Sequence, residues 1–247
     1  MSKKNNSRRS FLKKSIVIPP LFIVPRHVLG GKGYTSPSDK LNIAGVGVRK
    51  WGMGSNNIHQ CRSENIVALC DVDFNQSKPT FDKYPKAKIY KDYRIMLDKQ
   101  KDIDAVIVAT PDHNHAVITM KAIKMGKHVY CQKPLTHTVY EAREITKAAR
   151  KYNVQTQMGN QGGSSKGVDK IKEWVDKKLI GNINKVYSWT NRPVWPQGFK
   201  MPNPSSDKPK NLNWDLWLGP APYREYRPEF HPFNWRGWWD YGTGALG

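Results

Sequence analysis

Short apolar runs alternate with helix-like stretches between residues 41 and 160, and this alternation restricts the possible folds most strongly. Five runs have the length and apolar content of buried strands: Leu41–Gly45, Ile66–Cys70, Ala105–Thr110, His128–Cys131 and Val154–Met158. Apolar residues recur at helical spacing in Ala116–Met125 and Val139–Lys151. Strands that alternate with such helices predict parallel β–α–β units. The expected fold class is therefore α/β, with a doubly wound parallel sheet that binds ligands outside the carboxyl ends of its strands.

A glycine-rich turn follows the first predicted strand. The segment Gly45-Val46-Gly47-Val48-Arg49-Lys50 has the first two glycines of the dinucleotide-binding pattern G-x-G-x-x-G, but Lys50 replaces the third. The first glycine permits a tight turn, the second lets the backbone approach a pyrophosphate, and the third lets a helix pack closely on the strand. Gly52 and Gly54 follow, and either is able to take that third role through a shifted turn. We expect Gly45 and Gly47 to bind a dinucleotide.

An aspartate follows the second predicted strand. Asp71 lies 26 residues after Gly45, near the separation of about 20 residues that the pattern requires. A carboxylate at this position accepts hydrogen bonds from a ribose diol and repels a 2′-phosphate, so NAD is favoured over NADP. The alternatives are that Asp71 is only a turn residue at the strand end, or that Asp73 takes the role.

Polar residues also follow the third predicted strand, at the edge where a cofactor would lie. We expect Thr110, Pro111, His113 and His115 to contact the cofactor there. The two histidines are spaced as in some metal sites, but no third ligand is apparent nearby, so we expect no metal. A helix is expected to begin near Ala116, with either Asp112 or Asn114 as its N-cap.

Lys133 comes at the carboxyl end of the predicted strand His128–Cys131, between Gln132 and Pro134. A cation there would stabilise a developing alkoxide while a hydride is removed. A desolvated lysine could instead exchange the proton itself. The spacing alone is equally compatible with an ordinary surface lysine.

Together these segments resemble the Gfo/Idh/MocA family of NAD(P)-dependent oxidoreductases. The resemblance rests on the glycine turn and on three further segments in the same order: Cys70-Asp71-Val72-Asp73, Ala109-Thr110-Pro111-Asp112-His113-Asn114-His115 and Gln132-Lys133-Pro134. The last looks like the family's Glu-Lys-Pro motif, which implies that Lys133 is the catalytic lysine and that Gln132 contacts the cofactor. The chain departs from the family at Lys50 and at Gln132, where a glutamate charge beside Lys133 is lost.

The resemblance implies two domains after an N-terminal segment. Residues 41–160 would form an NAD(P)-binding Rossmann domain. Residues 161–247 would begin a C-terminal α/β substrate and oligomerisation domain with a mostly antiparallel open sheet. In that domain Val168–Lys177 is expected to be helical and Ile183–Thr190 to be the first long strand. The Pro- and Asn-rich stretch Pro193–Asn213 is too polar for a core.

The family's catalytic Asp-x-x-x-His pair would follow a glycine-rich stretch that resembles Gly242–Gly247, where this sequence ends. His231 and Asp240 lie outside that motif, so the role is not transferred to them. We therefore expect a chain truncated at its C-terminus, and a polypeptide of this length to be inactive.

The first 40 residues are expected to be an export signal and a linker. Ser7-Arg8-Arg9-Ser10-Phe11-Leu12-Lys13 precedes the apolar run Ile16–Val24, and paired arginines before a short apolar stretch match a twin-arginine signal. That pathway exports folded proteins, so we expect a periplasmic location; whether the signal is cleaved is left open. No apolar run approaches the roughly 20 residues of a spanning helix, and no membrane span is expected.

The net charge of +21 raises the question of a nucleic-acid partner. Residues 1–40 hold nine basic residues and one aspartate, or +8, and the remaining +13 is scattered through almost every later segment. No aromatic-basic recognition motif accompanies it. We expect a solvated basic surface and no nucleic-acid partner.

The resemblance implies an NAD(P)-dependent oxidoreductase that moves a hydride to or from a secondary alcohol of a sugar, cyclitol or glycoside. The partners would be a small carbohydrate-like substrate and, at full length, further copies of the chain. Seven of nine tryptophans fall in Trp189–Trp239; they would either line a sugar site or pack in a core and subunit interface. One alternative function is a glycosidase or lyase that recycles its NAD through a transient keto-sugar. Another is an inactive dinucleotide-binding fragment.

Overall fold

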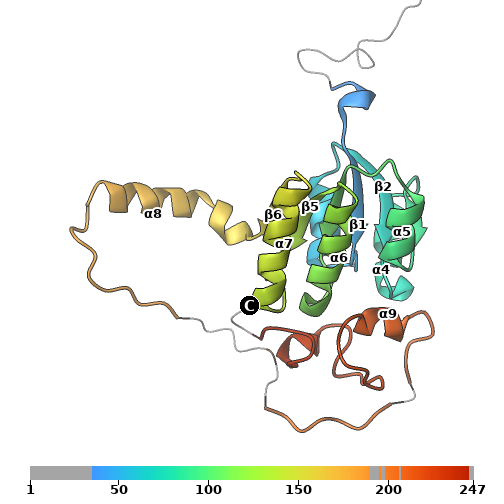
Figure 1. Cartoon of the computed structure of the whole chain (residues 1–247). Coiled ribbons are helices and arrows are strands. Elements are labelled where there is room, and N and C mark those ends of the chain that lie inside the picture. The colour runs from blue at the N-terminus through green and yellow to red at the C-terminus, as the bar shows by residue number, and fades with distance from the viewer. Residues whose placement is uncertain (1–34, 190–194, 196–197, 206, 245–247) are drawn as a thin grey trace, which may run out of the picture. The chain divides into compact units, whose positions relative to one another are not determined.

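A computed structural model describes residues 35–189, 195, 198–205 and 207–244 (Figure 1). The chain divides into two units, Met1–Lys40 and Leu41–Gly247. In the first unit the described residues form a short 3₁₀ helix, η1 (Pro37–Asp39). The predicted export signal lies outside the described residues. All further elements belong to the second unit.

The second unit contains one sheet of six parallel strands in the order β3-β2-β1-β4-β5-β6. The strands are β1 (Asn42–Val46), β2 (Asn65–Cys70), β3 (Lys88–Tyr90), β4 (Ala105–Val108), β5 (His128–Gln132) and β6 (Thr156–Gly159). The order reverses between β1 and β4, which is the switch point where doubly wound folds bind dinucleotides. All five predicted strands are present with small shifts at their ends, and the parallel α/β fold is confirmed. β3 was not predicted, because a strand of three residues is too short to show a period.

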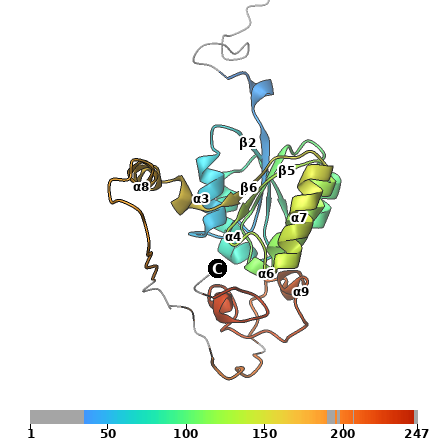
Figure 2. The ribbon, with the colours of Figure 1, turned by 60° about the vertical axis from the view of Figure 1, so that its left-hand side comes forward.

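Helices cover both faces of this sheet, as the turned view shows (Figure 2). One face carries α3 (Met53–Gln60) and α4 (Phe74–Lys83), and the other carries α5 (Tyr93–Lys99), α6 (Asp112–Lys124) and α7 (Val139–Lys151). Successive strand residues point to opposite faces, so each strand contributes to two cores. In β1, Ile43 packs in the core that contains Ile58 of α3, whereas Ala44 packs in the core with Ile118 of α6.

Two predictions about the helices have different outcomes. The predicted helix Val139–Lys151 is confirmed over its whole length, and a capping box between Thr138 and Glu141 fixes its start. The expected N-caps Asp112 and Asn114 are wrong. α6 begins at Asp112 after Pro111, without a side-chain cap hydrogen bond, because both side chains bond to a distant part of the chain instead.

The C-terminal part contains η2 (Gln161–Ser164), α8 (Lys166–Asp176), α9 (Trp214–Leu218) and η3 (Asn234–Gly237). α8 confirms the helix predicted near 168–177. The strand predicted at 183–190 is wrong over its described residues, which are exposed and assigned to no strand. A strand needs a neighbour for its backbone hydrogen bonds, and the described chain offers none there. The described residues of 193–213 are mostly exposed, as predicted, except that Leu212 is buried and bridges to Asp73.

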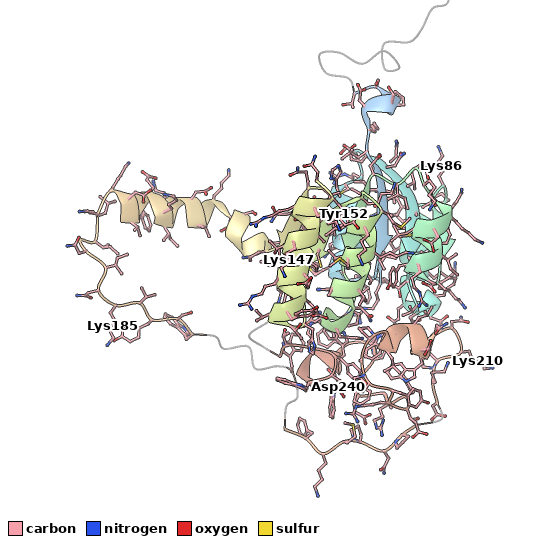
Figure 3. The ribbon with its side chains drawn as sticks, viewed as in Figure 1. Lys86, Lys147, Tyr152, Lys185, Lys210 and Asp240 are labelled. Atoms are coloured by element: carbon pink, nitrogen blue, oxygen red, sulfur yellow. The ribbon has the colours of Figure 1, made fainter. Side chains whose placement is uncertain are left out.

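Residues 211–244 fold into a small aromatic core, here called the aromatic segment, which lies at the carboxyl ends of the strands (Figure 1). The rings of Trp214 and Trp217 stack with their centroids 4.5 Å apart. An ion pair joins Arg224 to Asp240, which is labelled in Figure 3. The buried core residues of the segment are Leu212, Trp214, Trp217, Leu218, Tyr226, Phe230, Trp235 and Tyr241.

The surface of the second unit carries its basic residues in separate places. Lys86, Lys147, Lys185 and Lys210 are all exposed and belong to four different regions of the chain (Figure 3). The three cysteines are free thiols, and Cys70 and Cys131 are buried in strands. Among the residues that the structure describes, no helix is long and apolar enough to span a membrane.

Candidate cofactor and active site

A cleft of about 640 Å³ opens at the carboxyl ends of β1, β2, β4 and β5. The sheet side contributes seven of the predicted site residues: Gly47, Asp71, Thr110, Pro111, His115, Gln132 and Lys133. The aromatic segment forms much of the opposite side, with Trp217, His231, Phe233, Trp235 and Arg236. The remaining predicted site residues, Gly45 and His113, do not line the cleft.

The glycine turn is tightly packed, and it identifies the third glycine. Gly47 has a φ of +81°, and a Cβ on it would lie 2.7 Å from the backbone of Ala109. A Cβ on Gly54, the second residue of α3, would lie 1.9 Å from the carbonyl oxygen of Gly47. Gly54 therefore provides the close helix packing that Lys50 does not. Gly45 supports the turn from the core side, where a Cβ would lie 2.8 Å from Ile58.

Asp71 ties this turn to the end of β2. Its Oδ2 accepts a hydrogen bond from the Val48 amide at 2.8 Å, and its Oδ1 accepts one from the Asp73 amide at 3.0 Å. Burial raises the pKa of Asp71 above its usual value, and these hydrogen bonds oppose that rise. Each carboxylate oxygen has a second lone pair, so the group is still able to accept hydrogen bonds from a diol.

Asp73, the competitor of Asp71, has structural partners for its carboxylate. Its Oδ1 caps the start of α4 at the amides of Asn75 and Gln76. Its Oδ2 lies 2.7 Å from Nε2 of His231 in the aromatic segment. Burial raises the pKa of Asp73, but the hydrogen bonds from His231 and Gln76 outweigh it and hold that pKa below its usual value. Asp73 therefore joins the aromatic segment to the sheet.

His113 has the same joining role, outside the cleft. Its Nδ1 lies 3.2 Å from the Tyr241 carbonyl oxygen, and its Nε2 lies 3.0 Å from the Asn114 amide nitrogen and 2.9 Å from the Trp217 carbonyl oxygen. Burial lowers the pKa of His113 to about 4. A neutral ring donates to only one of the two carbonyl oxygens, and burial outweighs the second contact, which favours a charged ring. The expected cofactor contact is replaced by a contact that holds the aromatic segment in place.

His115 connects the ends of two strands that carry site residues. Nδ1 lies 2.7 Å from the Pro134 carbonyl oxygen, Nε2 lies 2.9 Å from the Thr110 carbonyl oxygen, and the residue is 1% exposed. Both nitrogens must carry a proton to donate to two carbonyl oxygens, so the geometry favours the cationic ring. Burial lowers its pKa, but the hydrogen bond with Cys131, the charge of Asp112 and the bond to the Pro134 carbonyl outweigh burial and raise it to about 9.

Lys133 and its neighbours present polar groups to the cleft. Lys133 lines the cleft and is an exposed residue. Its backbone amide donates a hydrogen bond to Oε1 of Gln132 at 3.3 Å. Nε2 of Gln132 and Oγ1 of Thr110 are buried and have no hydrogen-bond partner among the described residues. Such groups are costly to bury unsatisfied, and a ligand in the cleft would satisfy them. The described residues contain no group of three His, Cys, Asp or Glu side chains that could hold a metal ion.

The sequence reading missed the site residues of the aromatic segment. Trp217, His231 and Arg236 lie far along the chain from every predicted cofactor residue, yet they line the same cleft. His231 was set aside because it lies outside the catalytic motif, and the concentration of tryptophans was the other signal. It left two interpretations open, and the structure supports parts of both: Trp214 is a core residue, whereas Trp217 and Trp235 are core residues that also face the cleft.

Comparisons with known proteins agree with this architecture. A model of an oxidoreductase family with an NAD-binding Rossmann fold matches residues 41–160, and the model of that family's C-terminal alpha/beta domain matches residues 164–247. Inositol 2-dehydrogenase of Salmonella typhimurium is 28% identical over 148 residues, which cover 58% of this chain and 43% of that protein. D-glucoside 3-dehydrogenase of Escherichia coli is 30% identical over 118 residues, or 48% of this chain and 33% of that protein.

A solved structure shows the same fold. The crystal structure of myo-inositol 2-dehydrogenase from Lactobacillus plantarum superposes with a TM-score of 0.53 at 26% identity, covering 58% of this chain and 43% of that chain. These matches span less than half the length of each relative. By its family matches and the order of its motifs, the chain belongs to the Gfo/Idh/MocA oxidoreductases, whose Rossmann domain binds NAD.

Proposed function

We propose that this protein is an NAD-dependent dehydrogenase that acts on a secondary alcohol of a sugar, cyclitol or glycoside. One observation carries the proposal: Lys133 lines the same cleft as the Gly47 turn and Asp71, at the carboxyl ends of the parallel strands. In the proposal, Gly47 and Asp71 would bind the cofactor and Lys133 would act at the reactive end of the same site. Relatives named as inositol and glucoside dehydrogenases support the substrate class.

The residues present fit a dinucleotide. The Gly47 turn leaves no room for a Cβ and lets the backbone approach a pyrophosphate. Asp71 would accept hydrogen bonds from the ribose diol, and Thr110, Pro111 and Gln132 would surround the nicotinamide end, where two buried polar atoms need partners. His113 lies behind this surface, and His115 lines the cleft and holds the ends of two strands together. When bound, NAD supplies the hydride acceptor.

Lys133 would act on the substrate oxygen. Its ammonium group would donate a hydrogen bond to the hydroxyl that is oxidised and would stabilise the negative charge that develops on that oxygen. His231 and Asp240 do not provide the proton acceptor, because His231 bonds to Asp73 and Asp240 pairs with Arg224. We assign that step to an Asp/His pair of the family type, which no described residue matches.

The proposal also covers the setting of the enzyme. Residues 161–247 would belong to a second domain whose mostly antiparallel open sheet carries the substrate and the oligomer contacts. Residues 1–40 would direct export to the periplasm through the twin-arginine pathway. A small carbohydrate-like molecule is the expected substrate, and association with further copies of the chain is expected.

The test is hydride transfer, with Lys133→Met as the diagnostic variant. We expect slow NAD-dependent formation of NADH with myo-inositol or a D-glucoside, followed by absorbance, because solvent must accept the proton in place of the Asp/His pair. The rate should be about 100-fold lower in the variant because charge stabilisation is lost. The affinity for NAD, measured by calorimetry, should change less than about twofold. Lys86→Met removes an exposed lysine that precedes the amino end of β3 and does not line the cleft, and it serves as the matched control.

The outcomes separate the alternatives. NAD binding without any turnover by the unmodified chain would refute dehydrogenase activity for this polypeptide. Conversion of a glycoside without net NADH formation would favour an enzyme that recycles its NAD. An equal loss of activity in both lysine variants would refute the specific role of Lys133.

Asp71 is expected to set the preference for NAD over NADP. Asp71→Asn keeps one oxygen that is able to accept a hydrogen bond but removes the charge that repels a 2′-phosphate. The ratio of the NADP and NAD dissociation constants should fall about tenfold. Calorimetric titration with both dinucleotides checks this, with the exposed Asp102→Asn as control. An unchanged ratio would show that another group selects the cofactor.

A further inference from the structure

Two arginines from distant parts of the chain line the same cleft. Arg49 belongs to the turn after β1, and Arg236 belongs to η3 in the aromatic segment. Neither forms an ion pair with a carboxylate in the part of the chain that the structure describes. Arg49 donates from Nη1 to the Pro232 carbonyl oxygen at 2.6 Å, so its guanidinium is held against the aromatic segment.

Arg236 is held by aromatic rings rather than by a counter-charge. Its Cζ lies 4.1 Å from the ring centroid of Trp235, 5.1 Å from that of Trp195 and 5.2 Å from that of Phe233. These cation–π contacts orient the group and offset part of its desolvation. Burial lowers the pKa of Arg236, the nearby charge of Asp112 raises it, and the charge of Arg49 lowers it further.

None of the four aspartates that line the cleft pairs with either arginine in the described structure. Asp71 accepts hydrogen bonds from backbone amides, Asp73 contacts His231, and Asp92 pairs with Arg94. Oδ2 of Asp112 accepts hydrogen bonds from the amide and the hydroxyl of Thr243, at 3.1 and 2.9 Å. The positive charges of Arg49 and Arg236 therefore lie in the same partly desolvated cleft without a carboxylate paired to either of them. Their repulsion would be relieved by an anion bound between them.

The position of Arg49 indicates which anion. It lies two residues after Gly47, on the turn whose backbone is open to close approach. A planar guanidinium matches the oxygens of a phosphate with two parallel hydrogen bonds. We propose that Arg49 and Arg236 form a two-sided site for the pyrophosphate of the dinucleotide, which the aromatic segment covers. This inference rests on the proposed function, because it requires a dinucleotide in the cleft.

The site explains how the cofactor would be retained. Arg236 belongs to the aromatic segment, and that segment is attached to the sheet unit through His113 and through the bond between His231 and Asp73. An Arg236 bound to the pyrophosphate would add a further link between them. Release of the dinucleotide would then require this side of the cleft to open.

The experiment compares two probes that differ in the pyrophosphate. ADP-ribose and adenosine are titrated calorimetrically into the full chain and into Arg49→Met, Arg236→Met and Arg236→Lys. We expect each Met variant to bind ADP-ribose about tenfold more weakly and adenosine less than about twofold more weakly. Arg236→Lys should be intermediate, because it keeps the charge but not the planar fork. Arg143→Met, an exposed arginine on α7, is the matched control.

Folding is checked separately, because Arg236 packs on three rings. Near-ultraviolet circular dichroism of the aromatic segment should be unchanged in Arg49→Met, so that variant keeps the test valid if Arg236→Met unfolds the segment. Unchanged ADP-ribose affinity in both Met variants would overturn the site, as would an equal loss for adenosine. If the Met variants bind an anionic sugar such as glucuronate more weakly but bind ADP-ribose as the unmodified chain does, the pyrophosphate assignment is overturned. If the unmodified chain binds neither probe, the cofactor proposal itself fails.

Discussion

Replacing Gly54 with alanine is expected to abolish tight dinucleotide binding. The added Cβ would lie 1.9 Å from the carbonyl oxygen of Gly47, well inside any tolerable contact. The turn is unable to retreat, because Gly47 itself packs against the backbone of Ala109. α3 must therefore move away from the turn. We expect the dissociation constant for NAD to rise about 100-fold and the free energy of unfolding to fall by about 1–3 kcal/mol.

Calorimetry with NAD and thermal unfolding measure the two effects. Gly167→Ala is the matched control, because Gly167 is also the second residue of a helix, α8, and its Cβ would meet only Ser165 at 3.7 Å. The control should leave both quantities nearly unchanged. Normal NAD affinity in Gly54→Ala would show that Gly54 does not replace the missing third glycine.

The second large effect is a pH-dependent contribution of His115 to stability. Its folded pKa of about 9 lies above the usual value of 6.5. The stabilisation is therefore complete below pH 6.5 and is lost as the pH rises through 9, when the ring must give up one of its two hydrogen bonds. A shift of this size corresponds to about 3 kcal/mol. The difference in unfolding free energy between the unmodified chain and His115→Gln should shrink by about that amount between pH 6.5 and 9.

His113 provides a control of opposite sign. Its folded pKa of about 4 lies below the usual value, so its contribution is present above pH 6.5 and is lost as the pH falls through 4. Denaturant unfolding of His113→Gln should therefore differ from the unmodified chain in its acid dependence and not between pH 6.5 and 9. If His115→Gln shows no alkaline dependence relative to the unmodified chain, the cationic state of His115 is refuted.

Local sequence signals predicted the elements whose own residues carry the signal. The strands β1, β2, β4 and β5 are short apolar runs that the parallel sheet buries on both faces, so their composition alone identifies them. α7 carries its own start signal in Thr138 and Glu141. The strand expected at 183–190 failed, because a strand depends on a neighbour that its own sequence does not specify.

The tertiary structure decided the roles of the polar residues. From sequence, His113 and His115 are two equivalent histidines two residues apart. In the fold each ring faces two carbonyl oxygens. Burial dominates at His113 and lowers its pKa, whereas Cys131 and the charge of Asp112 outweigh burial at His115 and raise its pKa. The sequence pattern determined that a glycine turn, an acid and a lysine would meet at one sheet edge. Only the fold showed that Gly54 completes the turn and that Arg236 and Arg49 line one cleft beside the Phe233 ring, because those contacts join residues that no local pattern connects.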